Sequence, residues 1–434
     1  MLFYEMLGYF VFLYPLYMCV VWMVGGLIFS LRREGKGEPD LEEYPFFSLI
    51  VPAHDEEGVI EKTVRSLYAL DYPDYEIIVV NDGSNDRTGE ILDALVGEGS
   101  TRLKVIHLEP NSGKAQALNM GIIFSKGNFL LTIDADCILD PKALKWMAWH
   151  LVKFPRVGAV TGNPRVWNRT SLLGKIQVGE YSSIIGMIKR TQRILGKVLT
   201  VSGVIAAYRK SALLDCGLFD ADTVTEDIDI TWKLQKRFWD IRYEPRALCW
   251  VLVPETLRGL WRQRVRWSQG GVQVLKKHFN LFSGWRYRRL WPIYLDYVIG
   301  VFWAYSFFYL LLTWLVLTVY YNFCELHLIR KYCYALVEIR ERLALPLNPL
   351  YPRFYGAILG VACLMEFLVS FLIDLRYEGK NFFRYYFWII WYPFAYWMIS
   401  ALTAMVGSYN VLIRRSGESI KWKSPDRGLQ TLKS

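Results

Sequence analysis

Residues 130–137 read L-L-T-I-D-A-D-C, a short apolar run that stops at two acids, Asp134 and Asp136. The apolar run predicts a buried strand. Because strand side chains alternate between faces, the two aspartates should lie on one side just past its C-terminal end. Two carboxylates in one small volume repel each other unless a cation lies between them. Such oxygens favour Mg²⁺ or Mn²⁺ together with substrate phosphates, so the stretch is a candidate site for a metal and a diphosphate.

The same acids also have a purely structural interpretation. A helix is expected to begin near Asp140-Pro141, where Asp suits the N-cap and Pro suits the first turn. Asp134 and Asp136 would then belong to an acidic turn that precedes this helix. A D-x-D string alone does not decide between the two interpretations.

Strand-like and helix-like stretches alternate on both sides of this run. The predicted strands are 46–51, 75–80, 103–108, 129–133 and 157–161. Strands that alternate with amphipathic helices predict an α/β fold, with a mainly parallel sheet covered by helices on both faces. Ligands of such sheets bind beyond the carboxyl ends of the strands.

Four successive predicted strand ends carry polar, turn-forming or acidic residues. They are residues 52–57, 81–84, 111–114 and the pair Asp134 and Asp136. Neither a G-x-G-x-x-G after the first strand nor a G-x-x-x-x-G-K-[ST] is present, which excludes the usual dinucleotide and P-loop fingerprints.

Asp82 can accept hydrogen bonds from a base or a ribose, although N-D-G-S also predicts an Asx turn. Lys114 would add a positive charge near a nucleotide.

A second acidic motif, Thr225-Glu226-Asp227, lies beyond these strands. Thr followed by two acids suits a helix N-terminus, where carboxylates are stabilised by about 0.3 to 1 kcal/mol. A group-transfer enzyme also needs a carboxylate near the metal, but not bound to it, to take a proton from an acceptor hydroxyl. Asp227 is the best candidate for that base.

Residues 255–267 interleave apolar side chains with arginines. This pattern predicts an amphipathic helix on a membrane surface, with Trp at the headgroup level and Arg towards phosphate. Its functional interpretation uses Gln263, Arg266 and Trp267. A guanidinium can hold a diphosphate through paired hydrogen bonds, and an indole can stack on a sugar ring. Both interpretations can hold for one helix.

Composition places part of the chain in a membrane. Of its 434 residues, 53% are hydrophobic and 16% aromatic, which is too much for an ordinary soluble protein. The net charge is +10, and basic residues crowd the ends of apolar segments and residues 258–289. An anionic membrane surface and an anionic substrate explain this better than a nucleic acid does. Seven cysteines without a C-x-x-C pair indicate neither a zinc site nor a disulfide framework.

The first apolar segment, residues 7–31, is long enough to span a bilayer and is followed by Arg32, Arg33 and Lys36. It lacks the basic start and cleavage site of a signal peptide, and its basic end should lie in the cytoplasm. Further spans are expected at 292–321, 354–375 and 386–413, whereas 322–352 is too charged to span. Counting spans places the C-terminus outside, but the basic tail favours the inside.

The expected organisation has six parts. They are a transmembrane helix (1–33), a linker (34–45), an α/β domain (46–250), amphipathic interfacial helices (251–290), a membrane region of about three helices (291–413) and a basic tail (414–434).

Together, Asp82, the D-A-D at 134–136, the T-E-D at 225–227 and the Q-R-V-R-W at 263–267 resemble the processive family 2 glycosyltransferases, which include cellulose, chitin and hyaluronan synthases. Other strings are similar to the bacterial branch that makes poly-β-1,6-N-acetylglucosamine, the biofilm exopolysaccharide. They are V-G-A-V-T-G-N-P-R (157–165), G-K-I-Q-V-G-E-Y-S-S-I-I-G (174–186), V-S-G-V-I-A-A-Y-R (201–209), T-E-D-I-D-I-T-W-K-L-Q (225–235), Y-E-P-R-A-L-C-W (243–250) and W-K-S-P-D-R-G (422–428). The resemblance covers nearly the whole chain.

The resemblance implies a GT-A fold, UDP-N-acetylglucosamine as the donor, Mg²⁺ or Mn²⁺, and inversion at the anomeric carbon. Glu57 and Asp82 would hold the uridine, and Lys114 would lie beside the nucleotide. Asp134 would contact the diphosphate and the metal, and Asp136 the metal. One departure is that His54-Asp55 stands where the family usually has an aromatic residue and an Asn.

On the acceptor side, the resemblance implies that Asp227 is the base and that Glu226 helps to bind the acceptor. Gln263 and Arg266 would clamp the diphosphate, and Trp267 would lie beneath the acceptor sugar. The protein would be a multi-pass enzyme of the cell (inner) membrane with a cytoplasmic catalytic domain, and its helices would pass the growing polysaccharide outward.

The implied partners are membrane lipid and a small membrane subunit, with cyclic di-GMP bound at the interface between the two chains, and no nucleic acid. A cellulose- or hyaluronan-type synthase is an alternative, although the chain lacks an R-x-x-x-R with D-x-S-x-x-G module. A transporter or scaffold that binds nucleotide sugars without turnover is an alternative from another class. The intact acids at 134, 136 and 227 argue against it.

Overall fold

The computed structural model describes residues 2–35, 37, 41–326, 338, 340–341, 356–390, 392 and 397–413. Most of the charged segment predicted at 322–352 and the whole basic tail at 414–434 lie outside these residues. The side of the membrane on which the tail lies therefore stays a prediction.

An eight-stranded sheet forms the centre of the α/β domain, in the order β3-β2-β1-β4-β7-β6-β8-β5. The strands are β1 (Phe47–Ala53), β2 (Tyr75–Asp82), β3 (Leu103–Leu108), β4 (Phe129–Ile133), β5 (Cys137–Leu139), β6 (Val157–Val166), β7 (Ile205–Arg209) and β8 (Asp240–Val251). β3, β2, β1 and β4 are parallel to one another, and β6 is parallel to β8. β7 is antiparallel to β4 and β6, and β5 is antiparallel to β8. The predicted mixed, mainly parallel sheet is confirmed.

Helices cover both faces of the sheet. They are α2 (Ile60–Tyr68), α3 (Thr88–Gly97), α4 (Lys114–Phe124), α5 (Ala143–Lys153), α8 (Lys210–Cys216) and α9 (Glu226–Lys236). Leu49 and Val51 of β1 face the core formed with α2, α3 and α5, whereas Ile50 faces the core formed with α4, α8 and α9. This alternation follows from the two-residue period of a strand.

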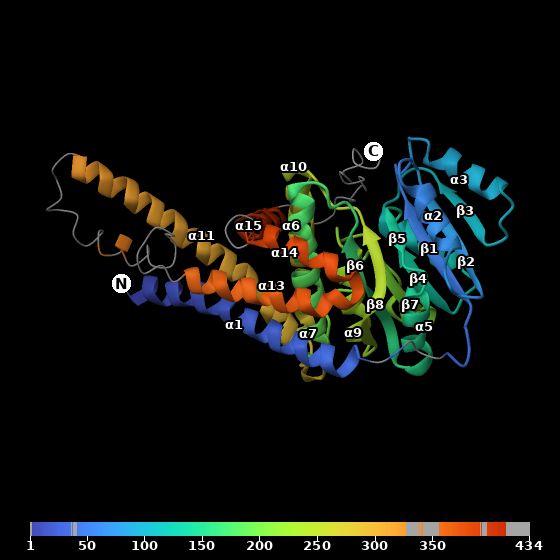
Figure 1. Cartoon of the computed structure of the whole chain (residues 1–434), viewed down its shortest axis with the longest axis horizontal. Helices are drawn as coiled ribbons and strands as arrows, with labels where there is room; N and C mark the ends of the chain where they lie inside the picture. The colour runs from blue at the N-terminus through green and yellow to red at the C-terminus, as the bar shows by residue number, and fades with distance from the viewer. Residues whose placement is uncertain are drawn as a thin grey trace.

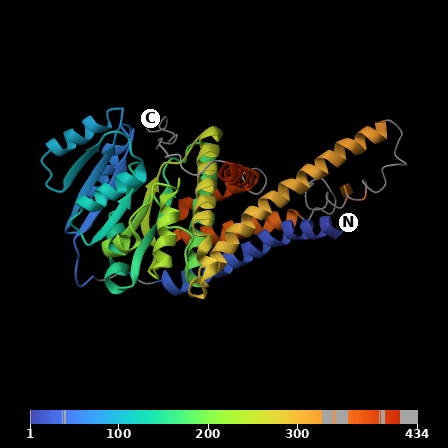
Figure 2. The ribbon, with the colours of Figure 1, turned by 180° about the vertical axis from the view of Figure 1, so that it is seen from behind.

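Two long helical elements lie between the sheet and the membrane helices. One is continuous through α6 (Leu172–Glu180), the π-helix η1 (Tyr181–Met187) and α7 (Ile188–Leu195). The other is α10 (Leu257–Lys277), whose N-cap residue Thr256 accepts a hydrogen bond from the Gly259 N–H at 3.0 Å. Figure 2 shows α10 standing between the sheet domain and the projecting helices.

Within the described residues, three helices are long and apolar enough to cross a membrane: α1 (Leu2–Arg33), α11 (Trp291–Leu326) and α13 (Gly356–Glu378). They extend from the same side of the sheet domain (Figures 1 and 2). In the predicted span 386–413, the described residues form two helices, the four-residue α14 (Tyr386–Ile389) and the shorter apolar helix α15 (Trp397–Ile413). The chain is therefore a membrane protein.

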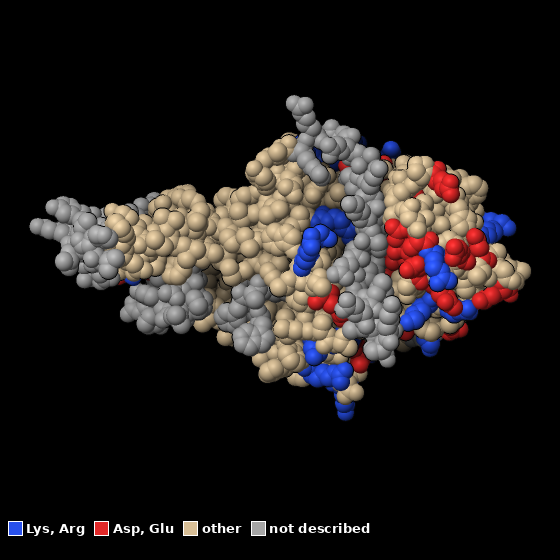
Figure 3. Space-filling view, turned by 90° about the horizontal axis from the view of Figure 1, so that it is seen from above, with Lys and Arg blue, Asp and Glu red and all other residues tan. Residues whose placement is uncertain are grey.

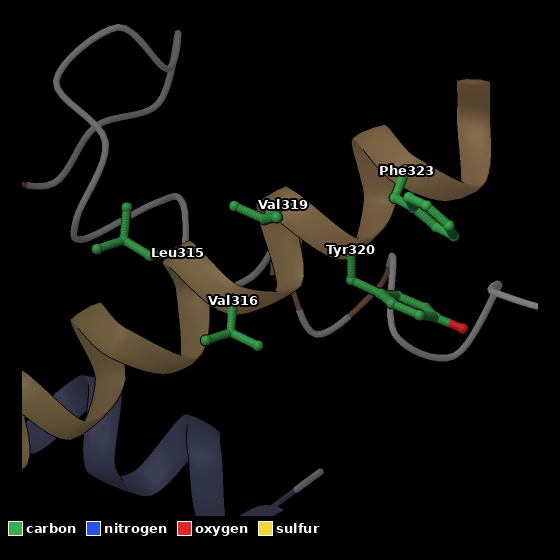
Figure 4. Close-up of a pocket in the computed structure, with 5 residues that line it drawn as sticks. All are labelled: Leu315, Val316, Val319, Tyr320 and Phe323. Atoms are coloured by element: carbon green, nitrogen blue, oxygen red, sulfur yellow. The ribbon is translucent and has the colours of Figure 1, made fainter. Parts of the chain in front are cut away.

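The surface agrees with this division. In Figure 3 the coloured charged atoms gather over the sheet domain, whereas the projecting helices present mainly other residue types. The outer part of α11 carries a shallow apolar depression (Figure 4). Its lining residues are Leu315, Val316, Val319, Tyr320 and Phe323. An apolar, charge-poor surface of this kind suits contact with lipid tails.

A buried group of ion pairs joins the membrane helices to the sheet domain. Arg190 of α7 pairs with Glu34, just after α1, at 2.6 Å and with Asp374 of α13 at 2.8 Å. Asp374 also pairs with Arg165 of β6 at 2.6 Å. The four side chains are at most 1% exposed, so each charge depends on its partner. We call Glu34, Arg165, Arg190 and Asp374 the junction cluster.

Candidate active site

The D-A-D acids lie in a tight turn after β4. The Cys137 N–H donates to the Asp134 carbonyl oxygen at 3.2 Å, and the Thr63 hydroxyl of α2 donates to the Ala135 carbonyl oxygen at 2.7 Å. Asp136 is buried, with 4% of its surface exposed. The turn thus holds both acids at the carboxyl edge of the parallel strands, as the sequence predicts.

Lys114, the first residue of α4, joins the two acidic motifs. Its Nζ lies 2.7 Å from Asp134 Oδ1 and 3.0 Å from Glu226 Oε1. Burial alone would lower the pKa of Lys114, but these two carboxylates outweigh it and raise that pKa. The same contact lowers the pKa of Glu226 against the opposing effect of burial. Residues more than 100 positions apart in the sequence therefore form one site.

The D-A-D pair carries excess negative charge. Burial, opposed by Lys114 and reinforced by Asp136, raises the pKa of Asp134. A raised carboxyl pKa means that the local environment disfavours a further negative charge. A divalent cation beside Asp134 and Asp136 would offset the repulsion between the two negative charges. Carboxylate oxygens are the ligands that Mg²⁺ and Mn²⁺ prefer. The two residues therefore fit a metal ion.

Asp227 lies in the first turn of α9 and is held from one side by a glycine. The Gly203 N–H donates to Asp227 Oδ2 at 3.1 Å, and a Cβ at position 203 would lie 3.1 Å from that oxygen. Burial raises the pKa of Asp227 to about 6, and the neighbouring Glu226 adds to the shift. A carboxyl group with this pKa is charged at neutral pH and is a stronger base than an exposed Asp.

Lys189 of α7 supports the loop that carries Gly203. Its Nζ donates to the hydroxyls of Thr161 at 3.2 Å and Ser202 at 3.0 Å, and the Ser202 N–H donates to the same Thr161 oxygen at 2.8 Å. Burial lowers the pKa of Lys189 to about 7, against the opposing charge of Asp227. The sequence analysis did not single out this lysine.

The Asp82 carboxylate is fully buried and bound by the loop that precedes α4. Its Oδ1 accepts from the Ser112 N–H and hydroxyl, both at 2.8 Å, and its Oδ2 accepts from the Gly113 N–H at 2.8 Å. The N-D-G-S segment does turn, because the Asn81 side chain accepts from the Ser84 N–H at 3.3 Å, but the Asp82 carboxylate binds residues 112 and 113 and does not form the Asx turn considered for it. Asp82 thus fixes the loop that leads into α4, whose first residue is Lys114.

Glu57 and the unusual His54 also contact neighbouring loops. Glu57 is exposed, and its Oε2 accepts from the Arg87 N–H at 3.1 Å. His54 Nδ1 donates to the Asp82 carbonyl oxygen at 2.8 Å, and Asn111 Nδ2 donates to His54 Nε2 at 2.9 Å. His54 therefore connects the ends of β1, β2 and β3, a role that its spacing in the sequence does not reveal.

α10 packs closely against the T-E-D motif. Gln273 Oε1 accepts from the Val224 N–H at 3.0 Å, and a Cβ at Gly270 would lie 2.1 Å from Thr225 Oγ1. Arg266 is exposed, and its charge contributes, after that of Lys114, to the lowered pKa of Glu226. The predicted helix and the predicted acids therefore meet.

Within α10, Arg264 contacts Trp267. The Arg264 guanidinium carbon lies 4.1 Å from the centre of the Trp267 ring, and Arg264 Nη2 lies 2.7 Å from Glu180 Oε2. Sequence reasoning assigned roles to Gln263, Arg266 and Trp267 but not to Arg264 or Glu180. The Glu180–Arg264 contact joins residues 84 positions apart, and no local pattern indicates it.

A second group of acids, Asp220, Asp222 and Asp229, lies close enough to share a cation. Lys277 Nζ already lies 2.6 Å, 2.7 Å and 3.0 Å from these three carboxylates, respectively. His278 Nε2 also contacts Asp229, at 2.8 Å from its Oδ1. Lys277, together with Lys233 at 2.8 Å from Asp220, offsets much of this negative charge, and the contact of Lys277 with Asp229 ties α10 to α9.

Comparisons with known proteins agree on one family. Residues 45–270 match the family described as "Glycosyltransferase like family 2". The poly-beta-1,6-N-acetyl-D-glucosamine synthase of Staphylococcus epidermidis is 37% identical over 425 residues, which cover 96% of this chain and 98% of that protein. The synthase of Staphylococcus aureus strain MSSA476 is 38% identical over 428 residues, with the same coverage.

A solved structure supports the fold. The mannosyltransferase PcManGT from Pyrobaculum calidifontis, in complex with GDP-Man and Mn²⁺, superposes with a TM-score of 0.64. The match covers 94% of this chain and 99% of that chain at 18% identity. At this identity the likeness concerns the fold alone.

Proposed function

This chain belongs to the family 2 glycosyltransferases, and we propose that it adds N-acetylglucosamine from UDP-N-acetylglucosamine to a growing β-1,6-linked poly-N-acetylglucosamine chain. The observation that carries the proposal is the contact of Lys114 with both acidic motifs, at 2.7 Å from Asp134 and 3.0 Å from Glu226. The 37–38% identity to poly-beta-1,6-N-acetyl-D-glucosamine synthases over 96% of the chain supports the choice of sugar and linkage.

Donor binding would use the carboxyl edge of the parallel strands. Asp134 and Asp136 would hold Mg²⁺ or Mn²⁺, which when bound neutralises the charge of the diphosphate as it leaves. Lys114 places a further positive charge at the same point. Gln263 and Arg266 would contact the diphosphate from α10, since α10 packs against the T-E-D motif.

The uridine would lie over the ends of β1 and β2, where Glu57 and Asp82 stand. Because both Asp82 oxygens already accept hydrogen bonds from residues 112–113, Asp82 would act mainly by holding this loop against the nucleotide. Glu57 is exposed, so a ligand could reach its carboxylate.

Asp227 would be the catalytic base. As the acceptor 6-hydroxyl oxygen forms its bond to the anomeric carbon, Asp227 takes the hydroxyl proton, and the bond from that carbon to the diphosphate breaks on the opposite side. Attack from the opposite side inverts the configuration. A pKa of about 6 suits this role near neutral pH. Trp267 and Glu226 would hold the acceptor sugar beside Asp227.

The membrane helices suggest where the product goes. We infer that the sheet domain lies in the cytoplasm, because Arg32 and Arg33 end α1 and basic residues mark the cytoplasmic side. The polymer would then leave past the helices beside α10. A small membrane subunit, with cyclic di-GMP bound between it and this chain, remains a prediction of the family resemblance.

The test is an assay of purified protein in lipid nanodiscs with single UDP-sugars and a divalent metal. We expect UDP release and polymer formation with UDP-N-acetylglucosamine, and β-1,6 linkages in the product by linkage analysis. Polymer from UDP-glucose, or a different linkage, would overturn the proposed substrate and product.

A further inference from the structure

Trp267 is in contact with a charged side chain that itself has a buried counterion. Arg264 and Glu180 are 6% and 5% exposed, and their charged groups lie 2.7 Å apart. The Arg264 guanidinium lies 4.1 Å from the centre of the Trp267 ring, well within the distance of a cation–π contact. Residues 264 and 267 are three positions apart on a helix, so they share one face of α10.

This arrangement limits the motion of the indole. Glu180 fixes the guanidinium, because a buried charge separated from its counterion carries a large desolvation penalty. The guanidinium covers one side of the Trp267 ring, and Trp267 is only partly buried. A rotation of the indole would break this stacking contact, so Glu180 acts on Trp267 through Arg264.

The contact also lies close to the donor site. Tyr181 follows Glu180 and is buried, and the charges of Arg264, Glu180 and Asp136 all act on its phenol. The junction of α6 with the π-helix η1 is therefore near enough to both Asp136 and α10 for their charges to influence the pKa of the buried Tyr181, which burial raises. A shift of Arg264 would change the position of Trp267 relative to the donor.

We propose that Arg264, held by Glu180, is a positioning residue that fixes the orientation of the Trp267 indole as a platform for the acceptor sugar. The inference rests on the proposed function, since it needs an acceptor that stacks on Trp267. The alternative is that the Glu180–Arg264 pair only ties α6 to α10.

Arg264→Lys separates the two roles. Lysine keeps a positive charge for Glu180 but has no planar group to stack on the indole. With soluble β-1,6-linked N-acetylglucosamine oligomers as acceptors, we expect the acceptor KM to rise about five- to tenfold, as for the loss of a partly desolvated cation–π contact. Polymers should become shorter, and the KM for UDP-N-acetylglucosamine should stay unchanged.

The chain contains a matched control. Arg246 stacks on Trp146 at 3.8 Å and pairs with Glu244 at 2.6 Å, and the stacking joins β8 to α5. None of these three residues is assigned to the candidate site. Arg246→Lys removes the same kind of contact. We expect it to shift the melting temperature as Arg264→Lys does, without changing the acceptor KM or the polymer length.

If Arg264→Lys lowers the melting temperature but leaves the acceptor KM and the polymer length at wild-type values, the pair is a structural tie and the inference is wrong. Should Arg264→Lys fail to fold, Glu180→Asp provides the second test, because it keeps the charge pair but draws the guanidinium back by one methylene. An unchanged acceptor KM in that variant would equally overturn the inference. A wild-type protein that makes no polymer from UDP-N-acetylglucosamine would instead refute the proposed function.

Discussion

Asp227 combines a raised pKa with a fixed orientation. Its Oδ2 accepts from the Gly203 N–H at 3.1 Å, and burial together with Glu226 raises its pKa to about 6. A base must be deprotonated to act, so the sign of the pH dependence follows directly. Activity should be half of its maximum near pH 6, approach its maximum at neutral pH and fall as the pH decreases further.

The first prediction tests this assignment. In a profile of kcat/KM for the acceptor against pH, we expect a tenfold loss for each unit of pH below about 6, as for a single essential base. Asp227→Asn keeps the shape of the side chain and should lower kcat by about 10²- to 10⁴-fold with nearly unchanged donor affinity. A loss of donor affinity in this variant would place Asp227 among the donor ligands.

The second prediction concerns Asp136, which is buried beside Asp134. Asp136→Asn removes a charged metal ligand while keeping the size of the side chain, so polymer synthesis should be abolished at normal expression and membrane insertion. Asp222→Asn is a control for the loss of one carboxylate, because Asp222 is exposed and contacts Lys277 at 2.7 Å. We expect nearly normal synthesis from the control. Normal polymer yield from Asp136→Asn would contradict the metal assignment.

At the scale of the elements, glycines allow α10 to lie close to its neighbours. A Cβ at Gly270 would lie 2.1 Å from Thr225 Oγ1, and one at Gly271 would lie 1.9 Å from the Tyr297 hydroxyl. A Cβ at Gly407 of α15 would likewise lie 2.7 Å from the Ser268 side chain of α10. Close approach of these backbones allows α10 to contact the T-E-D motif on one side and the membrane helices on the other.

The third prediction follows from this fit. Gly270→Ala should push α10 away from Thr225, with a loss of about 1 to 3 kcal/mol in stability, as is typical of overpacking, and a drop in turnover. Gly97→Ala is the matched control, because Gly97 ends α3 with no atom within 4 Å of the added Cβ. The control should be neutral or slightly stabilising. Equal melting temperatures for the two variants would show that α10 tolerates displacement.

The elements also show which parts of the fold were predictable. The strands that begin at Tyr75, Leu103 and Phe129 have strong apolar runs and were predicted within two residues at each end. β7 is a five-residue strand with two alanines, and it has no alternation to reveal it. β8 contains Pro245, which argues against a strand, but its pairing with β6 shifts register between Thr161 and Asn163 and so accommodates the proline.

The sequence predicts those candidate site residues that lie at the ends of strands or at the starts of helices. Asp134, Asp136 and Asp227 follow local patterns that need no knowledge of the fold. The contact of Lys114 with Glu226, and that of Glu180 with Arg264, depend on how distant segments pack. α9 begins at Glu226, as the T-E-D motif predicts, but the Thr225 side chain makes no capping hydrogen bond. Gly270 of α10 occupies the space beside the Thr225 hydroxyl.

On the scale of the whole molecule, the junction cluster makes the membrane helices part of the catalytic unit. Asp374 of α13 is the shared counterion of Arg165 and Arg190, and all three are buried. A buried arginine without its counterion is strongly destabilising. The sheet domain therefore depends on α13 for its stability.

The fourth prediction measures this dependence. Asp374→Asn should destabilise the protein by about 3 to 5 kcal/mol, because it leaves two buried arginines with reduced compensation. Glu98→Gln is the control, since Glu98 pairs with Arg65 at 2.8 Å on the surface and should contribute about 0 to 1 kcal/mol. Melting curves in one detergent would compare the two variants. Similar shifts would show that the junction cluster is not coupled to global stability.

The junction cluster also sets an order of events during synthesis. Asp374 follows Arg165 by 209 residues and Arg190 by 184 residues. At about 5 to 20 residues per second, the arginines leave the ribosome roughly ten to forty seconds before their counterion. A nascent chain that already contains both acidic motifs would still lack a stable junction between its sheet domain and α1. The sheet domain would then reach its full stability only when α13 has been made and has brought Asp374 to the two arginines.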